Sequence, residues 1–230
     1  MRAYYRSTAL QAVEALSNTG PLVDRIVGMP RDLVPANAGD IAPVLNVTGQ
    51  RATMLVPLFD YLAQGWDPAG SRQLDRLGVR WVVADHAIDG LRLRAQGAGW
   101  RIYERPRALS VLWTKGPGGV DTDDRSPAPV RQVRWQANRV TFELGPLPAS
   151  RLVFAQPAYP GWQAWVDGRR VALGREEIFP AIALPAGAHR VVFAYRPPLR
   201  AGGLLTLGCC LVLLGAGWRE RRARGAAARS

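Results

Sequence analysis

The stretch YPGWQAWVDGRRVAL, Tyr159 to Leu173, holds two tryptophans three residues apart and then an Asp-Gly pair. Asp-Gly tolerates the positive φ values of a type I′ turn and lies between two alternating runs, so it predicts a β-hairpin. Because side chains alternate along a strand, Trp162 is predicted to face the core and Trp165 the opposite side. Trp165 is therefore a candidate contact for a sugar or for a neighbouring domain. Packing against a domain is favoured, because one aromatic side chain makes a weak platform.

The hairpin belongs to a longer series of short alternating runs that follows a Gly-rich segment at 116–119. Seven strands are predicted there, at Val130–Gln136, Arg139–Leu144, Arg151–Gln156, Trp162–Val166, Arg169–Leu173, Ile178–Leu184 and His189–Arg196. Short strands at this spacing, with turn residues between them, are typical of an antiparallel sandwich. We therefore predict a β-sandwich over residues 117–197.

The residues before the sandwich mix helical and strand periods. Residues 1–20 include a short amphipathic segment, Thr8–Leu16, which we interpret as a helical connector. Within residues 21–116 the predicted helices are Pro57–Ala63 and Arg72–Leu77, and the predicted strands are Leu22–Val27, Val79–Ala84, Trp100–Glu104 and Leu109–Thr114. Helices followed at once by buried strands indicate a small α/β unit.

The most apolar run of the chain is AGGLLTLGCCLVLLGAGW, Ala201 to Trp218. It contains no charged residue, and at about 1.5 Å per residue it spans roughly 27 Å, close to the thickness of a bilayer core. The arginine-rich residues 219–230 favour the cytoplasmic side for this end. We therefore predict a transmembrane helix at 198–218, a basic cytoplasmic tail at 219–230, and a folded part outside the cytoplasm.

Export of the folded part requires a membrane signal. Charged residues interrupt residues 1–16, so these residues do not form the apolar stretch of a signal peptide. We therefore expect upstream or partner transmembrane helices, with the lipid bilayer as the other partner. Gly208 and Gly215 fall on one face of the predicted span and would allow such a helix to approach closely.

The 230-residue chain has a formal net charge of +12, and 48% of its residues are hydrophobic. This hydrophobic fraction suffices for a buried core. The charge would suit nucleic acid if the basic residues clustered, but outside the tail the arginines are scattered through strand-like segments. Lys115 is the only lysine, an imbalance explained more simply by base composition than by phosphate recognition. We expect no nucleic-acid partner.

Two groups of polar residues could carry chemistry. Asp85, His86 and Asp89 follow a predicted strand, and the histidine could form an acid–base pair with either carboxylate. A polar loop is the alternative, because no nucleophile-elbow sequence accompanies them. The second group, Asp121-Thr-Asp-Asp124, has the spacing of a metal-binding DxD motif, but its Gly- and Pro-rich surroundings favour a solvated turn. We predict no metal and no cofactor.

Three pairs of stretches carry a family resemblance. They are Leu33–Gly39 with Leu45–Gly49, Leu74–Val83 with Trp100–Leu109, and Tyr159–Gly168 with Leu184–Pro197 before the apolar run. In order and spacing they resemble the C-terminal part of YfhO-type bacterial membrane proteins, which are similar to the GT-C membrane glycosyltransferases. The resemblance implies sugar transfer from a polyprenyl-phosphate donor onto a cell-envelope polymer or lipid. It gives no catalytic residue, because the GT-C catalytic acid belongs to a loop between membrane helices that these residues do not include.

The sequence thus predicts an α+β chain with a small α/β unit, an antiparallel β-sandwich and one C-terminal transmembrane helix. We expect it to serve in the bacterial cell membrane as the extracytoplasmic part of a glycosyltransferase-like protein. Its ligand would be a polyprenyl-linked sugar or an envelope glycan. A membrane-anchored carbohydrate-binding or adhesion module without catalysis is the alternative. A soluble hydrolase using Asp85 and His86 is a third hypothesis, which requires these side chains to meet in a cleft.

Overall fold

The computed structural model describes residues 8–17, 24–29, 45–46, 56–64, 67–116 and 125–196. These ranges contain three helices and three five-stranded sheets, here called sheets A, B and C. None of the helices in them has the length and apolar character needed to cross a bilayer. The predicted span at 198–218 and the tail at 219–230 lie outside the described residues.

Sheet A has the strand order β2-β1-β3-β5-β4. Its strands are β1 (Arg25–Met29), β2 (Leu45–Asn46), β3 (Val79–Ala84), β4 (Arg92–Gly97) and β5 (Trp100–Glu104). β1 pairs in parallel with β2 and β3, whereas β5 pairs antiparallel with β3 and β4. The strands predicted at 79–84 and 100–104 are confirmed at the same residues.

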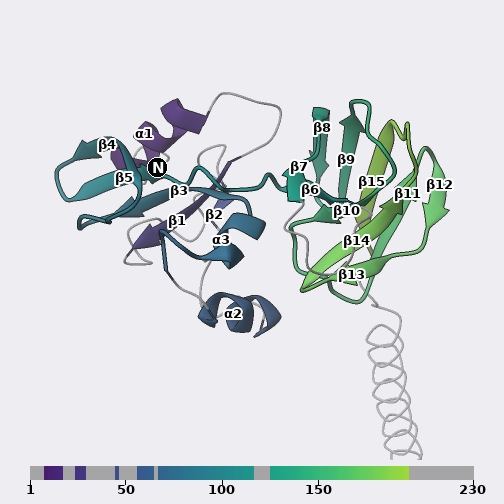
Figure 1. Ribbon diagram of the computed structural model, residues 1–230, viewed down its shortest axis with the longest axis horizontal. Helices are drawn as coiled ribbons and strands as arrows, with labels where there is room; N and C mark the ends of the chain where they lie inside the picture. Colours follow the sequence, from purple (N-terminus) through teal and green to yellow (C-terminus); the bar gives the residue numbers. More distant parts are fainter. Residues whose placement is uncertain are drawn as a thin grey trace, which may run out of the picture. The chain divides into compact units, whose positions relative to one another are not determined.

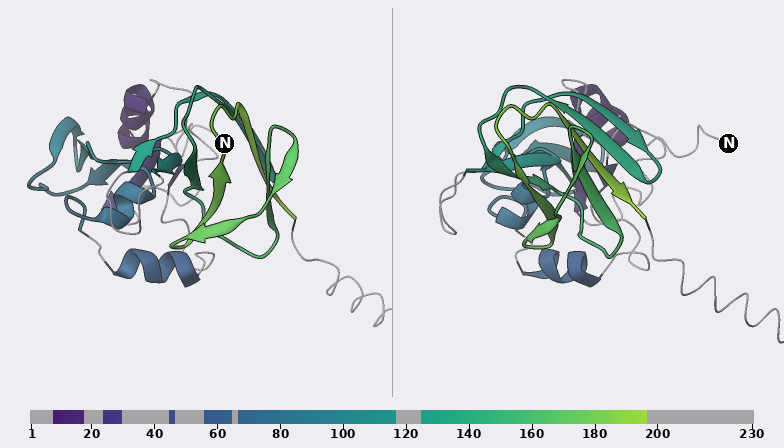
Figure 2. Two further views of the ribbon diagram at one scale, coloured as in Figure 1. Left: turned by 45° about the vertical axis from the view of Figure 1, so that its right-hand side comes forward. Right: turned by 90° about the vertical axis from the view of Figure 1, so that its right-hand side faces the viewer.

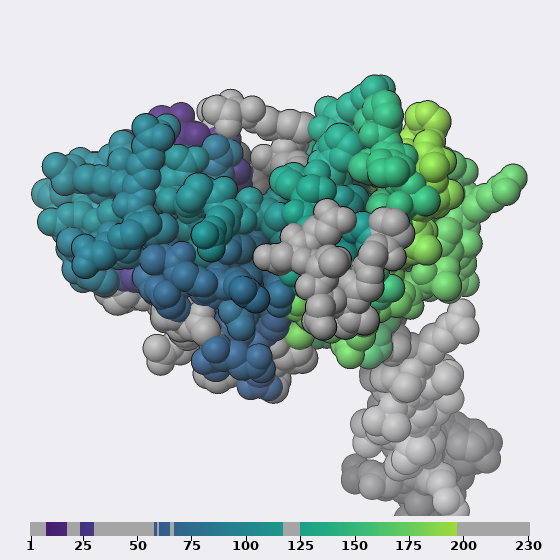
Figure 3. Space-filling view, in the orientation of Figure 1, coloured from purple at the N-terminus to yellow at the C-terminus, as the bar shows by residue number. Residues whose placement is uncertain are grey.

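Helices cover both faces of sheet A (Figure 1). They are α1 (Thr8–Ser17), α2 (Val56–Ala63) and α3 (Arg72–Arg76). Leu10 and Val13 of α1 pack with Trp81 of β3 on one face, which confirms the amphipathic helix predicted there. Leu62 of α2 and Leu74 of α3 belong to the core on the other face. The space-filling view shows α2 and α3, in blue, next to each other on the surface (Figure 3).

The local sequence explains where α3 begins and ends. The Ser71 hydroxyl accepts a hydrogen bond from the Leu74 N–H at 3.3 Å, which caps the first turn. After the helix, Gly78 has a φ of 71°, and a Cβ atom there would lie 2.6 Å from the Leu109 carbonyl oxygen. Only glycine accommodates both this backbone conformation and this approach, and the chain then enters β3 directly.

Sheets B and C form an antiparallel sandwich (Figures 1 and 2). Sheet B has the order β13-β14-β10-β6-β7, with β6 (Leu112–Lys115), β7 (Arg125–Pro127), β10 (Ser150–Phe154), β13 (Gly174–Glu176) and β14 (Phe179–Leu184). Sheet C has the order β12-β11-β15-β9-β8, with β8 (Val130–Gln136), β9 (Arg139–Leu144), β11 (Trp162–Val166), β12 (Arg169–Val171) and β15 (Arg190–Tyr195). The predicted β-sandwich is confirmed.

The sandwich begins one strand earlier than the boundary predicted at residue 116. Leu109–Thr114 was predicted as a strand of the first unit, but β6 pairs with β7 and β10 in sheet B. The reason lies in its two-sided burial, since Leu112 belongs to the core between sheets B and C and Trp113 to the core shared with sheet A. A strand that is apolar on both faces does not reveal from its pattern which sheet it joins.

The other central strands of sheet B are buried on both faces as well. In β10, Leu152 and Phe154 belong to the core inside the sandwich, whereas Val153 belongs to the core shared with sheet A, α2 and α3. Phe179 of β14 is fully buried in that shared core. The α/β part and the sandwich therefore have one hydrophobic core in common.

The stretch from Tyr159 to Leu173 folds as predicted. β11 and β12 pair around Asp167 and Gly168, whose φ values of 47° and 81° fit a type I′ turn. The Asp167 carboxylate also accepts a hydrogen bond from the Arg190 N–H at 2.8 Å, which ties the turn to β15. Trp162 packs against the sandwich core, as predicted for the inward indole.

Candidate functional site

One end of the sandwich holds a cavity of about 250 Å³, here called the aromatic cleft. The strand register explains why its residues meet. Trp162 at the start of β11 pairs with Tyr195 at the end of β15, and the Tyr195 N–H donates a hydrogen bond to the Asn138 carbonyl oxygen in the β8–β9 turn. The lining residues are Trp135, Gln136, Ala137, Asn138, Arg139, Val140, Phe154, Gln156, Tyr159, Trp162 and Tyr195.

Aromatic rings form the walls of the aromatic cleft and hold one another in place. The Trp162 ring lies edge-on to Phe154, with 5.7 Å between centroids, and 5.5 Å from the Tyr195 ring. Trp135 lies 6.2 Å from both Phe142 and Phe154, yet remains 38% exposed. An indole that is anchored by the core and still exposed offers a fixed apolar face to a ligand.

Two buried donors of the cleft have no hydrogen-bond partner among the described residues. They are the Tyr159 hydroxyl and the Trp162 Nε1–H. Leaving a buried polar group unpaired costs about 1–3 kcal/mol, so such groups usually bind protein, water or ligand. Burial raises the pKa of Tyr159, and the nearby Tyr195 adds to this, so the hydroxyl keeps its proton. Both residues line the cleft, and each has a donor that no described group satisfies.

The remaining polar side chains of the cleft are three amides, the Tyr195 hydroxyl and one cation. Gln136, Asn138 and Gln156 can each donate and accept hydrogen bonds, and Arg139 is the single charged residue of the lining. Apolar walls with a few polar groups are typical of small-molecule sites. The cleft volume lies just below the ~300–1,000 Å³ of pockets for drug-sized ligands. The cleft therefore suits one ring-sized, nearly neutral ligand with several hydroxyl or amide groups.

Trp165 is not among the lining residues of the aromatic cleft. It follows Trp162 by three positions on β11, is half-buried, and pairs across the sheet with Arg170 and Val192. Its alternation with Trp162 places it on the outer side of sheet C. A sugar or domain contact by Trp165 stays a prediction.

Asp85, His86 and Asp89 lie in the loop after β3 and do not line the aromatic cleft. His86 Nδ1 is 2.7 Å from an Asp85 carboxylate oxygen, so these two side chains meet, but they are 61% and 49% exposed. Asp89 is exposed and has no ion pair or side-chain hydrogen bond within the described residues. Exposure leaves the pair without the desolvated surroundings that usually tune catalytic groups. A catalytic role for these residues stays a prediction.

Among the described residues, no group of three or more His, Cys, Asp or Glu side chains could hold a metal ion. The motif at Asp121–Asp124 lies outside the described ranges, as do Cys209 and Cys210.

Sequence reasoning assigned Trp162 to the core and gave Trp165 as the candidate contact, so it did not identify the residues of the cleft. Trp135, Tyr159 and Tyr195 are far apart in the chain and meet only through the pairing of β8, β9, β11 and β15. The sequence feature that could have predicted the cleft is the position of its aromatic residues along the strands. Trp135, Trp162 and Tyr195 all lie at or next to strand ends. Antiparallel pairing can bring such ends to the same edge of a sheet.

The fold combines a mixed sheet with an antiparallel sandwich, and an aromatic cleft lies at the end of the sandwich. No protein-family model, curated protein or solved structure matches the chain. Because a fold hosts many functions, the function is argued from the chemistry of the cleft.

Proposed function

We propose that this chain binds glycans through the aromatic cleft, with one sugar ring stacked on Trp135. The observation that carries the proposal is the pair of buried donors without partners, the Tyr159 hydroxyl and the Trp162 Nε1–H, beside an aromatic wall. A ligand that accepts hydrogen bonds from these donors and covers the rings removes two free-energy costs. One is the cost of the unpaired buried donors, and the other is the cost of the aromatic surface exposed to water.

A pyranose ring matches both requirements. One side of the ring presents C–H groups, which are attracted to the electron-rich face of an indole. Its rim carries hydroxyls, which can accept from the Tyr159 hydroxyl and the Trp162 Nε1–H and donate to the amide oxygens of Asn138 or Gln156. A purely apolar ligand would leave the two donors unpaired, and an ion alone would not use the rings.

The charge and size of the cleft narrow the class of sugar. Arg139 is the only charged residue of the lining, so a neutral sugar, or one with a single acidic group, fits best. About 250 Å³ accommodates roughly one ring rather than a long oligosaccharide. The favoured ligand is therefore the terminal hexose or N-acetylhexosamine of a cell-envelope glycan.

The sequence supports the cellular setting that we propose. The apolar run 201–218, its basic tail and the resemblance to YfhO-type proteins support a role as the extracytoplasmic domain of a polyprenyl-phosphate-sugar-dependent glycosyltransferase-like protein. In that setting the cleft would hold the acceptor glycan while partner membrane helices carry out the transfer. A membrane-anchored glycan-binding module without catalysis is the second candidate, favoured by the cleft itself.

Calorimetric titration of the full chain with hexose and N-acetylhexosamine disaccharides tests glycan binding. The detergent should have a polyoxyethylene head, because sugar-headed detergents would compete for the cleft. Tyr159→Phe removes one hydroxyl and keeps the ring, so affinity should fall about fivefold, the value of a ~1 kcal/mol neutral hydrogen bond. Trp165→Phe tests the alternative sugar contact outside the cleft and should bind like the wild type if the cleft is the site. The proposal is wrong if no saccharide binds, or if both variants lose affinity equally.

The membrane setting has its own test. Fusion of an extracytoplasmic reporter to Ser230 should give no activity, and fusion of a cytoplasmic reporter should give activity. The opposite result would exclude the proposed orientation and leave glycan binding by the cleft untouched.

A further inference from the structure

A second cavity of about 320 Å³ lies where α3, the segment after β5 and β7 meet. We call it the arginine pocket. Its lining residues are Arg72, Asp75, Arg76, Arg107, Leu109 and Arg125. None of them lines the aromatic cleft, so the two cavities are separate sites.

Positive charge exceeds negative charge around the arginine pocket. Asp75 is already paired, because its carboxylate lies 2.6 Å from Nη2 of Arg105, a guanidinium that is 2% exposed. Glu177 is the second neighbouring carboxylate, and it contacts both Arg76 and Arg125. With Arg105 included, and without counting Arg125, which has a further partner, the guanidinium groups of Arg72, Arg76, Arg105 and Arg107 outnumber the two carboxylates by two among the described residues.

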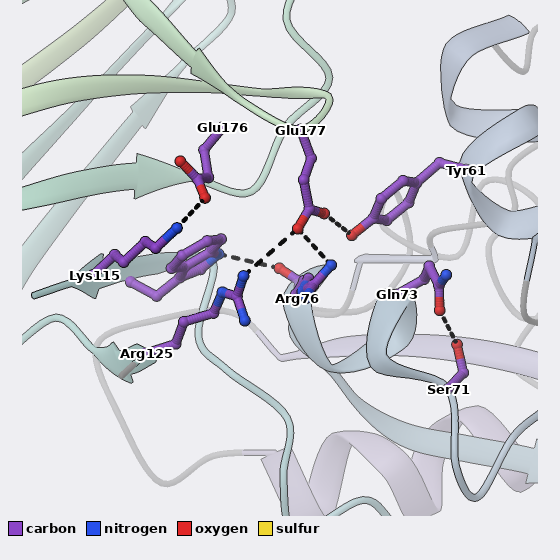
Figure 4. Close-up of polar contacts among 9 residues, drawn as sticks. Tyr61, Ser71, Gln73, Arg76, Lys115, Arg125, Glu176 and Glu177 are labelled. Carbon is purple, nitrogen blue, oxygen red and sulfur yellow. Dashed lines mark hydrogen bonds and ion pairs between the residues drawn. The ribbon is translucent and has the colours of Figure 1, made fainter. Parts of the chain in front are cut away.

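The Glu177 carboxylate is the shared partner of several donors at the wall of the pocket (Figure 4). Oε1 of Glu177 contacts Arg76 and lies 3.7 Å from Arg125 Nη2, while Oε2 accepts a hydrogen bond from the Tyr61 hydroxyl at 2.5 Å. Glu177 adopts a φ of 55° in the turn between β13 and β14, a conformation that non-glycine residues seldom adopt. Each guanidinium has five N–H donors, so this single carboxylate leaves donors on Arg76 for another anion.

The wall is held rigidly in place. The Arg125 guanidinium lies over the Trp113 ring, 5.7 Å from its centroid, and the Trp113 Nε1–H donates a hydrogen bond to the Arg76 carbonyl oxygen at 3.2 Å. Burial opposes the charge on Arg76, but Glu177 and Tyr61 outweigh it and raise the pKa of Arg76 overall. Arg76 and Arg125 are thus held in place before any ligand arrives.

Two arginine side chains at the pocket have no anionic partner among the described residues. Arg72 and Arg107 are exposed, and within the described residues neither has an ion pair or a side-chain hydrogen bond. Behind Asp75, the buried Nε and Nη1 atoms of Arg105 also have no hydrogen-bond partner among the described residues. Like charges held this close repel one another unless an anion joins them.

We infer that the arginine pocket binds a phosphate or pyrophosphate group, with Arg72 and Arg107 as its direct contacts. Guanidinium groups match phosphate oxygens with two parallel hydrogen bonds, and the excess of guanidinium groups over carboxylates among the described residues suits an anion of two or more charges better than a carboxylate. The phosphate can belong to a soluble compound or to a lipid headgroup, since both present the same oxygens.

The test uses the full chain in polyoxyethylene detergent at constant ionic strength, titrated with inorganic pyrophosphate. Arg72→Gln with Arg107→Gln should weaken binding at least about tenfold. Arg169→Gln with Arg170→Gln removes the same charge from the exposed β12 hairpin and should change binding less than about twofold. Chloride at equal ionic strength should give no saturable signal.

Two further titrants distinguish the sources of the phosphate. Glycerol 3-phosphate carries the phosphate without chains, and dihexanoyl phosphatidic acid adds short chains while staying soluble. Tighter binding of the lipid identifies a headgroup, and equal binding identifies a soluble compound. The inference is overturned if none of the three phosphates binds saturably, or if both double variants weaken binding to the same extent.

Discussion

Replacing Phe179 by alanine tests whether the α/β part and the sandwich fold around one shared core. Phe179 is fully buried in β14. Its ring lies edge-on to Tyr61 of α2, with 5.4 Å between centroids, and edge-on to Trp113 of β6, with 6.5 Å between centroids. The alanine variant loses contacts to both parts of the chain at once.

Phe179→Ala is expected to lower the free energy of unfolding by a large amount for a single substitution. A buried Phe→Ala change costs about 3–5 kcal/mol, which combines lost burial with the cavity left behind. Two edge-to-face contacts worth about 0.5–1.5 kcal/mol each place this site at the upper end of that range. Phe179→Leu keeps most of the volume and should cost less than about 1.5 kcal/mol.

Urea unfolding, followed by tryptophan fluorescence and by far-ultraviolet circular dichroism, measures these losses. The two signals should give one coincident transition in the wild type, and it should move to lower urea in the alanine variant. The reasoning fails if Phe179→Ala costs less than about 1 kcal/mol, or if the two signals separate in the wild type.

Three further predictions concern other contacts. Asp167→Ala should lower the free energy of unfolding by about 1 kcal/mol, measured by urea unfolding, because Arg190 loses its acceptor; an unchanged midpoint would contradict this. Arg25→Met should cost about 2–4 kcal/mol in the same assay, because the buried guanidinium donates to the carbonyl oxygens of Leu77 and Ala155, and a gain in stability would refute it. Burial, and after it the hydrogen bond to Glu177, raise the pKa of Tyr61 above its ordinary value of 10.0. The protonated Tyr61 hydroxyl therefore stabilises the folded state below pH 10, and this stabilisation is lost as the pH rises further. The thermal midpoint of Tyr61→Phe should therefore fall less than that of the wild type above pH 10, and parallel curves would count against this.

The strands of the sandwich were largely predictable from the sequence, because each combines alternation with a turn signal. β8, β9 and β11 begin and end at the predicted residues, and the Asp167-Gly168 turn is as expected. The very short strands β7 and β13 were missed, since three residues give no measurable period. β6 was assigned to the wrong unit, because burial on both faces removes the alternation that would identify its sheet.

Neither cavity could be derived from a local pattern. The aromatic cleft combines residues from the ends of several strands, and the arginine pocket combines α3 with segments that follow it much later in the chain. The conformation of Glu177 is a further example, since a glutamate with positive φ has no sequence signature. Such sites depend on strand register, which the sequence constrains through the burial of each face and through the turns of hairpins.

Saturation-transfer difference NMR on the full chain, with the hexose and N-acetylhexosamine disaccharides as ligands, tests the central claim most directly. Irradiation of aromatic protein protons should transfer magnetisation to the C–H protons on one face of one sugar ring. The transfer should weaken in Trp135→Ala and persist in Trp165→Phe, because Trp135 lines the aromatic cleft and Trp165 does not. Transfer to none of the saccharides, or transfer that depends on Trp165 and not on Trp135, would contradict glycan binding at this site.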